Sequence, residues 1–199
     1  MLDYLYLNKL NIFLKNKIHI FITDPEMVKI VDNEINYILK KKGSAYFLFI
    51  EERGSISIRS EYKNENDMKR GLAFFLKNAF GRQIDYSKPN NFEKITNICD
   101  LKKVMLNSCC DDNAYSVECP QADSINICEA EEKTFYEIYY LDTKMNKHMI
   151  ERDNKIPYIF ERFYNEVIYF ITKKKMIEEY ENVFGDKLLD QHKFDLLGY

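Results

Sequence analysis

One stretch, residues 43–82, limits more than any other how this chain can fold. It reads GSAYFLFIEERGSISIRSEYKNENDMKRGLAFFLKNAFGR. Residues 45–51 are rich in aromatic and β-branched side chains, and residues 55–62 alternate apolar with polar side chains, so both segments predict strands. Arg53 and Gly54 between them suit a tight turn. Apolar residues at helical spacing from about Asp67 onward predict an amphipathic helix. The stretch therefore predicts an antiparallel hairpin followed by a helix.

A looser version of this pattern returns between residues 133 and 175. The segment TFYEIYYL at residues 134–141 is a strong candidate for a strand, and residues 145–150 suit its partner. A helical pattern of apolar residues then begins after Pro157. Recurrence of a supersecondary pattern indicates two modules that pack their apolar faces.

These patterns predict an α+β fold. We expect the 199 residues to form a single compact domain with two loosely repeated halves, residues 1–88 and 89–199. Each half would consist of an antiparallel hairpin or sheet packed with amphipathic helices.

The N-terminal region leads to two further expectations. Residues 2–14 fit a helix and a strand equally well, whereas residues 18–22 resemble a short strand. The triplet Thr23-Asp24-Pro25 is a typical helix start, and Gly43 is a typical helix stop. Between them lies an apolar stripe at helical spacing, formed by Met27, Ile30, Val31, Ile35, Ile38 and Leu39. This stripe predicts a helix that ends at the lysines 40–42, where cations complement the helix dipole.

Composition restricts the class of protein. Hydrophobic residues make up 46% of the chain and charged residues 31%, as in ordinary soluble globular proteins. The net charge of −3 disfavours a nucleic-acid partner. Asn8, Lys9 and Asn11 interrupt the apolar N-terminus, and no window is long enough for a membrane span. Five cysteines, an odd number, suit a reducing compartment, so we expect a cytoplasmic protein.

No pattern in the sequence predicts catalysis. Cys109, Cys110, Cys119 and Cys128 lack the close pairs that zinc sites use, although four thiols leave a zinc site as an alternative. The three histidines lie in no catalytic motif, and the isolated glycines form no phosphate-binding loop. A His–Cys or His–Ser pair assembled by folding stays open. We therefore expect a protein that is not an enzyme and has no cofactor and no metal.

The segment 108–132 differs from the rest of the chain in charge. It contains neither Lys nor Arg, and its carboxylates are Asp111, Asp112, Glu118, Asp123, Glu129, Glu131 and Glu132. One interpretation is a solvated flexible loop. The other is a negative surface that attracts and holds a basic partner, because complementary charge raises encounter rates and selects partners. On the second interpretation these seven residues are partner-binding residues.

Part of the hairpin stretch is similar to a known family. The sequences GSAYF at residues 43–47 and ERG at residues 52–54, followed by a polar gap and the helix from Asp67, resemble the central pattern of bacterial immunity proteins. These are the antitoxins encoded beside polymorphic and contact-dependent growth-inhibition toxins. The resemblance implies a cytosolic, non-enzymatic protein that binds one cognate toxin domain and blocks its active site. Many such toxins are basic nucleases, which the acidic segment would suit.

Two other functions stay open. The lysine runs at 40–42 and 173–175, together with many aromatic residues, are compatible with a nucleic-acid-binding module in which rings stack on bases. The helix ends expected at both runs explain them equally well. A viral or phage protein that binds a host factor is also compatible with the composition. The sequence does not reveal the oligomeric state.

Overall fold

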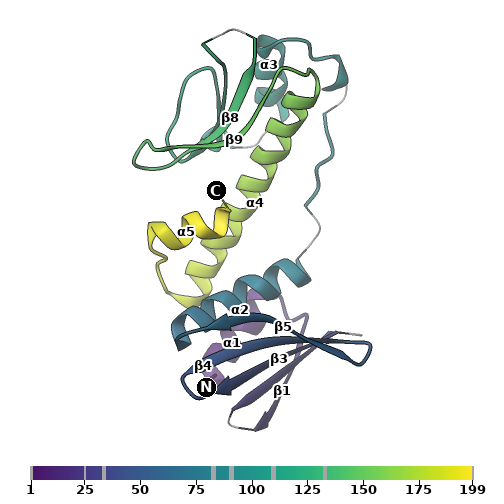
Figure 1. Ribbon diagram of the computed structural model, residues 1–199, viewed down its shortest axis with the longest axis vertical. Helices are drawn as coiled ribbons and strands as arrows, with labels where there is room; N and C mark the ends of the chain where they lie inside the picture. Colours follow the sequence, from purple (N-terminus) through teal and green to yellow (C-terminus); the bar gives the residue numbers. More distant parts are fainter. Residues whose placement is uncertain are drawn as a thin grey trace. The chain divides into compact units, whose positions relative to one another are not determined.

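The computed structural model describes residues 2–24, 26–32, 35–81, 84–89, 92–108, 111–131 and 134–198. Helices and two β-sheets occur in this part of the chain, which confirms the α+β class (Figure 1). The chain divides into two units. The N-terminal unit comprises Met1–Arg82 and Glu179–Asp186, and the C-terminal unit comprises Gln83–Glu178 and Lys187–Tyr199.

A five-stranded antiparallel sheet dominates the N-terminal unit. Its strands follow one another in chain order: β1 (His19–Asp24), β2 (Met27–Asp32), β3 (Ile35–Lys42), β4 (Ala45–Glu52) and β5 (Ser55–Tyr62). Arg53 and Gly54 both have positive φ, 48° and 81°, as in the mirror-image turns whose twist matches a hairpin. The predicted hairpin is therefore confirmed, with Glu52 and Ser55 as its closing pair.

Two helices, α1 (Tyr4–Phe13) and α2 (Glu65–Phe80), pack beside this sheet in the N-terminal unit (Figure 1). The side chain of Asn64 caps α2, and the helix ends at Gly81. Tyr37 of β3 packs edge-on against Phe75 and Phe80 of α2. Gly71 faces Tyr62 of β5 so closely that a Cβ atom there would clash with the Tyr62 ring, so only glycine permits this approach. The helices thus cover one face of the sheet.

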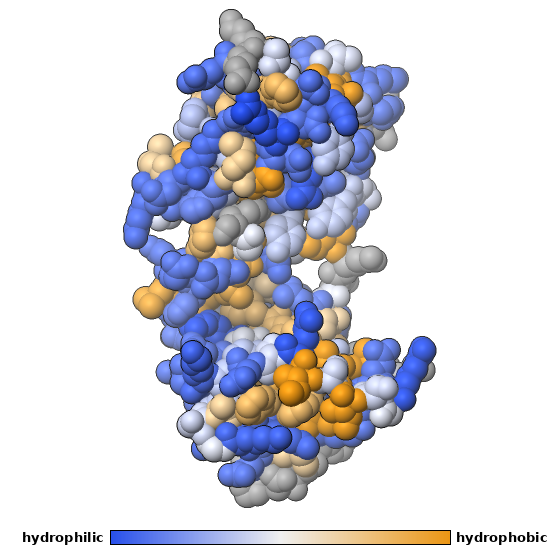
Figure 2. Space-filling view, in the orientation of Figure 1, coloured by the Kyte–Doolittle hydropathy of each residue, from blue (hydrophilic) through white to orange (hydrophobic). Residues whose placement is uncertain are grey.

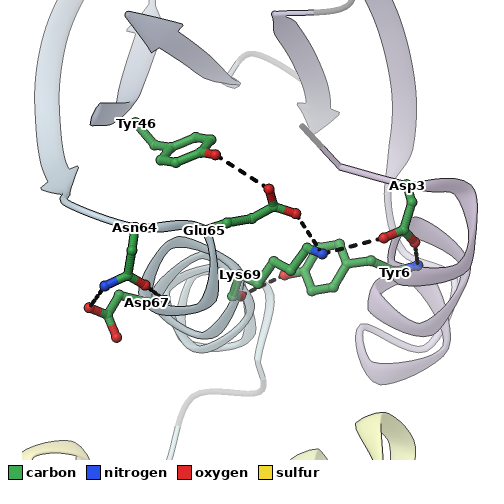
Figure 3. A network of polar contacts seen from close by, with 7 residues as sticks. All are labelled: Asp3, Tyr6, Tyr46, Asn64, Glu65, Asp67 and Lys69. Carbon is green, nitrogen blue, oxygen red and sulfur yellow. Dashed lines mark hydrogen bonds and ion pairs between the residues drawn. The ribbon is translucent and has the colours of Figure 1, made fainter. Parts of the chain in front are cut away.

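A polar network ties these elements together (Figure 3). Lys69 forms ion pairs with Glu65 at 2.8 Å and with Asp3 at 3.3 Å. The Tyr46 hydroxyl donates to Glu65 at 3.3 Å, and the Tyr6 hydroxyl donates to the Lys69 carbonyl at 2.6 Å. The hydrogen bond from Lys69 is the main cause that holds the pKa of Glu65 below its usual value. The network links α1, α2 and β4 and accounts for these polar side chains structurally.

The expected helix over residues 27–42 is wrong, because the structure forms β2 and β3 there. The apolar residues of this segment also satisfy a two-residue period. Val28, Ile30 and Leu39 are fully buried, and in the sheet Val28 lies opposite Leu39. Pairing of β3 with β4 along its whole length supplies hydrogen bonds and neighbours that an isolated helix lacks. By contrast, residues 4–13, which left helix and strand open, form α1.

The C-terminal unit contains a four-stranded sheet and most of a long helix. In chain order its elements are a 3-10 turn (Phe92–Lys94), α3 (Ile98–Ser108), β6 (Tyr115–Val117), β7 (Ser124–Glu129), β8 (Tyr136–Leu141), β9 (Lys147–Asp153), α4 (Tyr158–Phe184) and α5 (Asp190–Leu197). β8 and β9 match the predicted strands. β6 and β7 run parallel, which differs from the wholly antiparallel sheet that we expected. The last residues of α4, from Glu179, belong to the N-terminal unit.

Aromatic contacts between α4 and this sheet form the core of the C-terminal unit. Phe160 and Phe163 of α4 have no exposed surface, and their rings lie 5.0 Å from Tyr136 and 6.4 Å from Tyr115. The ring of Tyr140 lies 5.6 Å from Phe170. The buried face of α4 therefore determines where β6 and β8 sit. None of the helices within the described ranges combines the length and apolar character needed to cross a membrane.

Candidate protein-binding surfaces

The predicted acidic residues separate into two groups at opposite ends of β6 and β7. Because these strands are parallel, their starts lie side by side, and so do their ends. Asp111, Asp112 and Asp123 precede the two strands, whereas Glu118, Glu129 and Glu131 lie at or beyond the ends. Glu132, the seventh predicted residue, lies outside the described residues. The segment therefore presents two smaller negative patches, which we call the start patch and the end patch.

Other parts of the C-terminal unit neutralise some of this charge. Asp123 forms an ion pair with Lys174 of α4 at 2.9 Å and accepts a hydrogen bond from Tyr140 at 3.0 Å. Burial is the main cause that raises the pKa of Tyr140, and the charge of Asp123 adds to it. Glu118 lies 3.9 Å from the Lys102 ammonium. Asp112 in the start patch and Glu131 in the end patch are exposed, so each presents its negative charge at the protein surface.

A second surface, which the sequence interpretation did not predict, lies on the N-terminal sheet. We call it the open face, meaning the side of β1–β5 opposite α1 and α2. The strand registers place the following side chains on it: His19, Lys29, Val31, Asn36, Ile38, Lys40, Lys42, Phe47, Phe49, Glu51, Ile56, Ile58 and Glu61. Ile56 and Ile58 keep 60% and 64% of their surface exposed. In the space-filling view, hydrophobic side chains gather over this sheet (Figure 2).

The open face combines aromatic rings with ammonium groups. The Lys42 ammonium lies 5.9 Å from the centre of the Phe47 ring and 5.8 Å from that of Phe49. The Lys40 ammonium lies 5.7 Å from the Phe49 ring centre. A cation above an aromatic face is attracted by the ring quadrupole, while the lysine stems extend the apolar surface. The two rings, half-buried and 6.4 Å apart, therefore form a platform flanked by positive charge.

One carboxylate of the open face is neutralised within the sheet. Glu51 accepts from Lys29 at 3.2 Å and from the Asn36 amide at 2.8 Å. The hydrogen bond from Lys29 is the main cause that lowers the pKa of Glu51. These two contacts link the Glu51 carboxylate to β2 and β3. A second carboxylate on this face, Glu61, lies beside Phe47 and is exposed.

The alternation of β5 did signal that Ile56 and Ile58 share one face, but it did not indicate which face is covered. Phe47 and Phe49 point away from the helices, because Tyr46 and Leu48 on the same strand occupy the covered face. Only the position of α2 distinguishes the two faces of β4.

A polar cleft of about 690 Å³ lies within the C-terminal unit. Its wall on α4 includes Arg162, Asn165, Glu166 and Tyr169. Arg162 pairs with Glu166 at 2.7 Å, so the arginine charge is balanced within the wall. Burial raises the pKa of Tyr169. Arg162 and Glu166 balance each other's charge, but within the described residues the Arg162 Nε and the Asn165 Oδ1 are buried without a hydrogen-bond partner.

The described thiols and imidazoles form no common cluster. Cys99, Cys119 and Cys128 are free thiols, and Cys109 and Cys110 lie outside the described residues. The described ranges contain no group of three or more His, Cys, Asp or Glu side chains placed to hold a metal ion. The His148 Nε2 lies 3.3 Å from Asp142, and the imidazole stacks with the Tyr140 ring and meets the Phe194 ring at a tilt. His19 is exposed on the open face.

Comparison of the chain with protein-family models, curated proteins and solved structures found no match in any of the three. The two patches and the open face are therefore interpreted from their own chemistry.

Proposed function

We propose that this chain is an immunity protein, which binds a cognate toxin domain and neutralises it by covering the toxin's active site. The observation that carries the proposal is the open face, where Ile56 and Ile58 are exposed beside the Phe47–Phe49 platform. Contiguous exposed apolar surface of this kind marks interaction sites in soluble proteins. Aromatic anchors surrounded by polar groups are typical of the centre of a protein–protein interface.

The chemistry of the open face favours a protein over a nucleic acid. Aliphatic side chains such as Ile56 and Ile58 contact apolar protein surface well but do not stack on bases. Glu61 on the same face would repel a phosphate backbone, and the net charge of the chain is −3. A nucleic-acid partner would need a positive groove, whereas Lys29 is already paired with Glu51. The lysines beside the rings instead suit carboxylates at the edge of a protein interface.

The acidic residues supply a second contribution. Asp111, Asp112, Glu118, Asp123, Glu129, Glu131 and Glu132 would steer a partner that is basic overall, such as a nuclease domain. Within this group Asp112 and Glu131 are exposed, and we expect them to contribute more than Asp123, which Lys174 neutralises. Steering changes the association rate more than the strength of the final complex.

Growth rescue tests the proposal. The toxin domain encoded next to this gene is expressed in cells with and without this chain, and the purified pair is studied by calorimetry. We expect rescue of growth and a 1:1 complex. Survival that does not improve, together with no measurable binding, would reject the immunity function.

A matched pair of variants then tests the open face. Ile56→Glu with Ile58→Glu places two charges on the open face, whereas Ser55→Glu with Ser57→Glu places the same charges on the other side of β5. We expect the isoleucine pair to weaken binding roughly 100-fold, as loss of two interface anchors does, and the serine pair to leave it nearly unchanged. Equal effects of the two pairs would show that the toxin does not contact this face.

A further inference from the structure

The outer edge of β5 offers backbone hydrogen-bonding groups to a second chain. β5 is the last strand of its sheet, and within the described residues it pairs only with β4. Residues 55–62 contain no proline and residues 55–58 contain no charge, and Ser55 to Ile58 are all exposed. Edge strands are usually protected by lysine, proline, a bulge or a covering segment, since unpaired edges recruit other strands. Here the register shifts only opposite Leu48 and Phe49, beyond the Ser55–Ile58 stretch.

The turn geometry shows which groups point outward. In a two-residue hairpin the pair that closes the turn, here Glu52 and Ser55, exchanges hydrogen bonds, and the pattern then alternates along the strands. Ser55 and Ser57 therefore direct their N–H and C=O groups toward β4. Ile56 and Ile58 direct theirs away from the sheet, to the free edge.

The sequence of this edge is symmetric. Ile56-Ser57-Ile58 reads the same in both directions, so an antiparallel copy related by a two-fold axis at Ser57 brings Ile56 opposite Ile58 on both sides of the axis. Both pairs are then hydrogen-bonded pairs made of outward-pointing groups. Each isoleucine also meets an isoleucine on the open face, the kind of cross-strand contact that stabilises sheets. The same axis places Arg53 of one copy opposite Glu61 of the other. The opposite charges of these two residues favour the antiparallel orientation.

We propose that β5 pairs with β5 of a second copy of this chain, in antiparallel orientation about Ser57, to form one continuous sheet across a two-fold symmetric dimer. The pairing uses the strand edge and leaves the open face accessible, so it does not depend on the proposed immunity function. A contact confined to one strand is small, and interfaces of that size are transient. The dimer is therefore weak and its population depends on protein concentration.

Sedimentation velocity from about 10 μM to about 1 mM, a range that brackets weak association, measures the dimer with the protein alone. We expect the mass to rise from 23.9 kDa toward twice that value. Ile58→Pro removes the outward N–H but no bond to β4, a position where edge strands accept proline. It should weaken dimerisation by about tenfold or more, because it removes one hydrogen bond from each of the two symmetry-related Ile56–Ile58 pairs. The matched control Ile58→Val keeps the N–H and the β-branched shape and should change it little.

Amide hydrogen exchange gives a test that needs no variant. The amides of Ile56 and Ile58 should gain protection as the protein concentration rises, whereas those of Ser55 and Ser57 should not change. A protein that stays monomeric throughout, or exchange at Ile56 and Ile58 that ignores concentration, overturns the proposal. So does a dimer that persists unchanged in a folded Ile58→Pro protein. A strand donated only by a different protein would leave this chain monomeric when alone, which is the same negative outcome.

Discussion

The two sheets of this protein differ in how many of their faces are covered by other parts of the chain. In the C-terminal sheet Ser124, Ile125, Asn126 and Ile127, four successive residues of β7, are all buried, so both faces of that strand are covered. Asn126 is 1% exposed, and its amide donates to the Gln121 and Ser124 carbonyls and accepts from the Gln121 amide. In the N-terminal sheet one face is covered by α1 and α2, while Ile56 and Ile58 remain in water on the other.

The difference shows that the apolar side chains serve different purposes in the two sheets. In β7 the isoleucines contribute to stability, and the buried asparagine is tolerated because its hydrogen bonds are made inside the unit. In β5 the isoleucines contribute little to the stability of the isolated unit, because folding does not remove them from water. Apolar residues that folding leaves exposed are available to a partner. Each of the following predictions tests this contrast.

The largest expected effect is on stability. Ile127→Ala removes a side chain that is 1% exposed and should lower the free energy of unfolding by about 2–5 kcal/mol. Ile58→Ala removes the same atoms from a side chain that is 64% exposed and should cost less than about 1 kcal/mol. Urea denaturation followed by circular dichroism measures both. Similar losses for the two variants would mean that the open face is covered in solution.

A smaller effect is expected on association with the toxin domain. Neutral replacements in both acidic patches should lower the association rate about tenfold at low salt and flatten its salt dependence, because steering is electrostatic. The variant replaces Asp112, Glu118, Glu129 and Glu131 with Asn or Gln. Stopped-flow mixing at two salt concentrations gives the rates. The control removes equal charge elsewhere, at Glu93, Glu178, Asp186 and Asp195. Equal rates for variant, control and parent would exclude the acidic patches from recognition, even with the immunity function intact.

The smallest effect concerns pH and the turn between β8 and β9. Asp142 accepts bonds from the Asn146 side chain and from the Asn146 and Lys144 amides, and these lower its pKa to about 2. Because the folded pKa lies below the ordinary value of 3.8, the stabilisation is complete above that value and is lost as pH falls through about 2. Amide exchange in β8 and β9 should therefore accelerate over this interval.

Asp142→Asn should remove that pH dependence, whereas Asp112→Asn in the start patch should retain it. Exchange in β4 and β5 provides an internal reference from the other sheet, where Asp142 has no role. If the hairpin loses protection identically in the parent and in Asp142→Asn, the acid sensitivity arises elsewhere.

Prediction from sequence succeeded where neighbours along the chain decide the structure. The hairpin of β4 and β5 depends on Arg53 and Gly54, which adopt the turn locally, and α2 depends on its cap at Asn64 and on its own apolar stripe. It failed over residues 27–42, where the apolar residues fit both helical and strand periods. There the pairing of β2 and β3 with each other, and of β3 with β4, selects the strands.

The candidate surfaces divide in the same way. The amino-acid sequence alone determined that residues 108–132 are acidic and that Ile56 and Ile58 share a side of β5, because charge and alternation are properties of consecutive residues. Only the tertiary structure brought Lys102 and Lys174 to Glu118 and Asp123, and only the position of α2 decided which side of β4 and β5 faces water. Both outcomes depend on contacts between segments far apart in the chain, and local sequence carries no record of which distant segment will cover a given face.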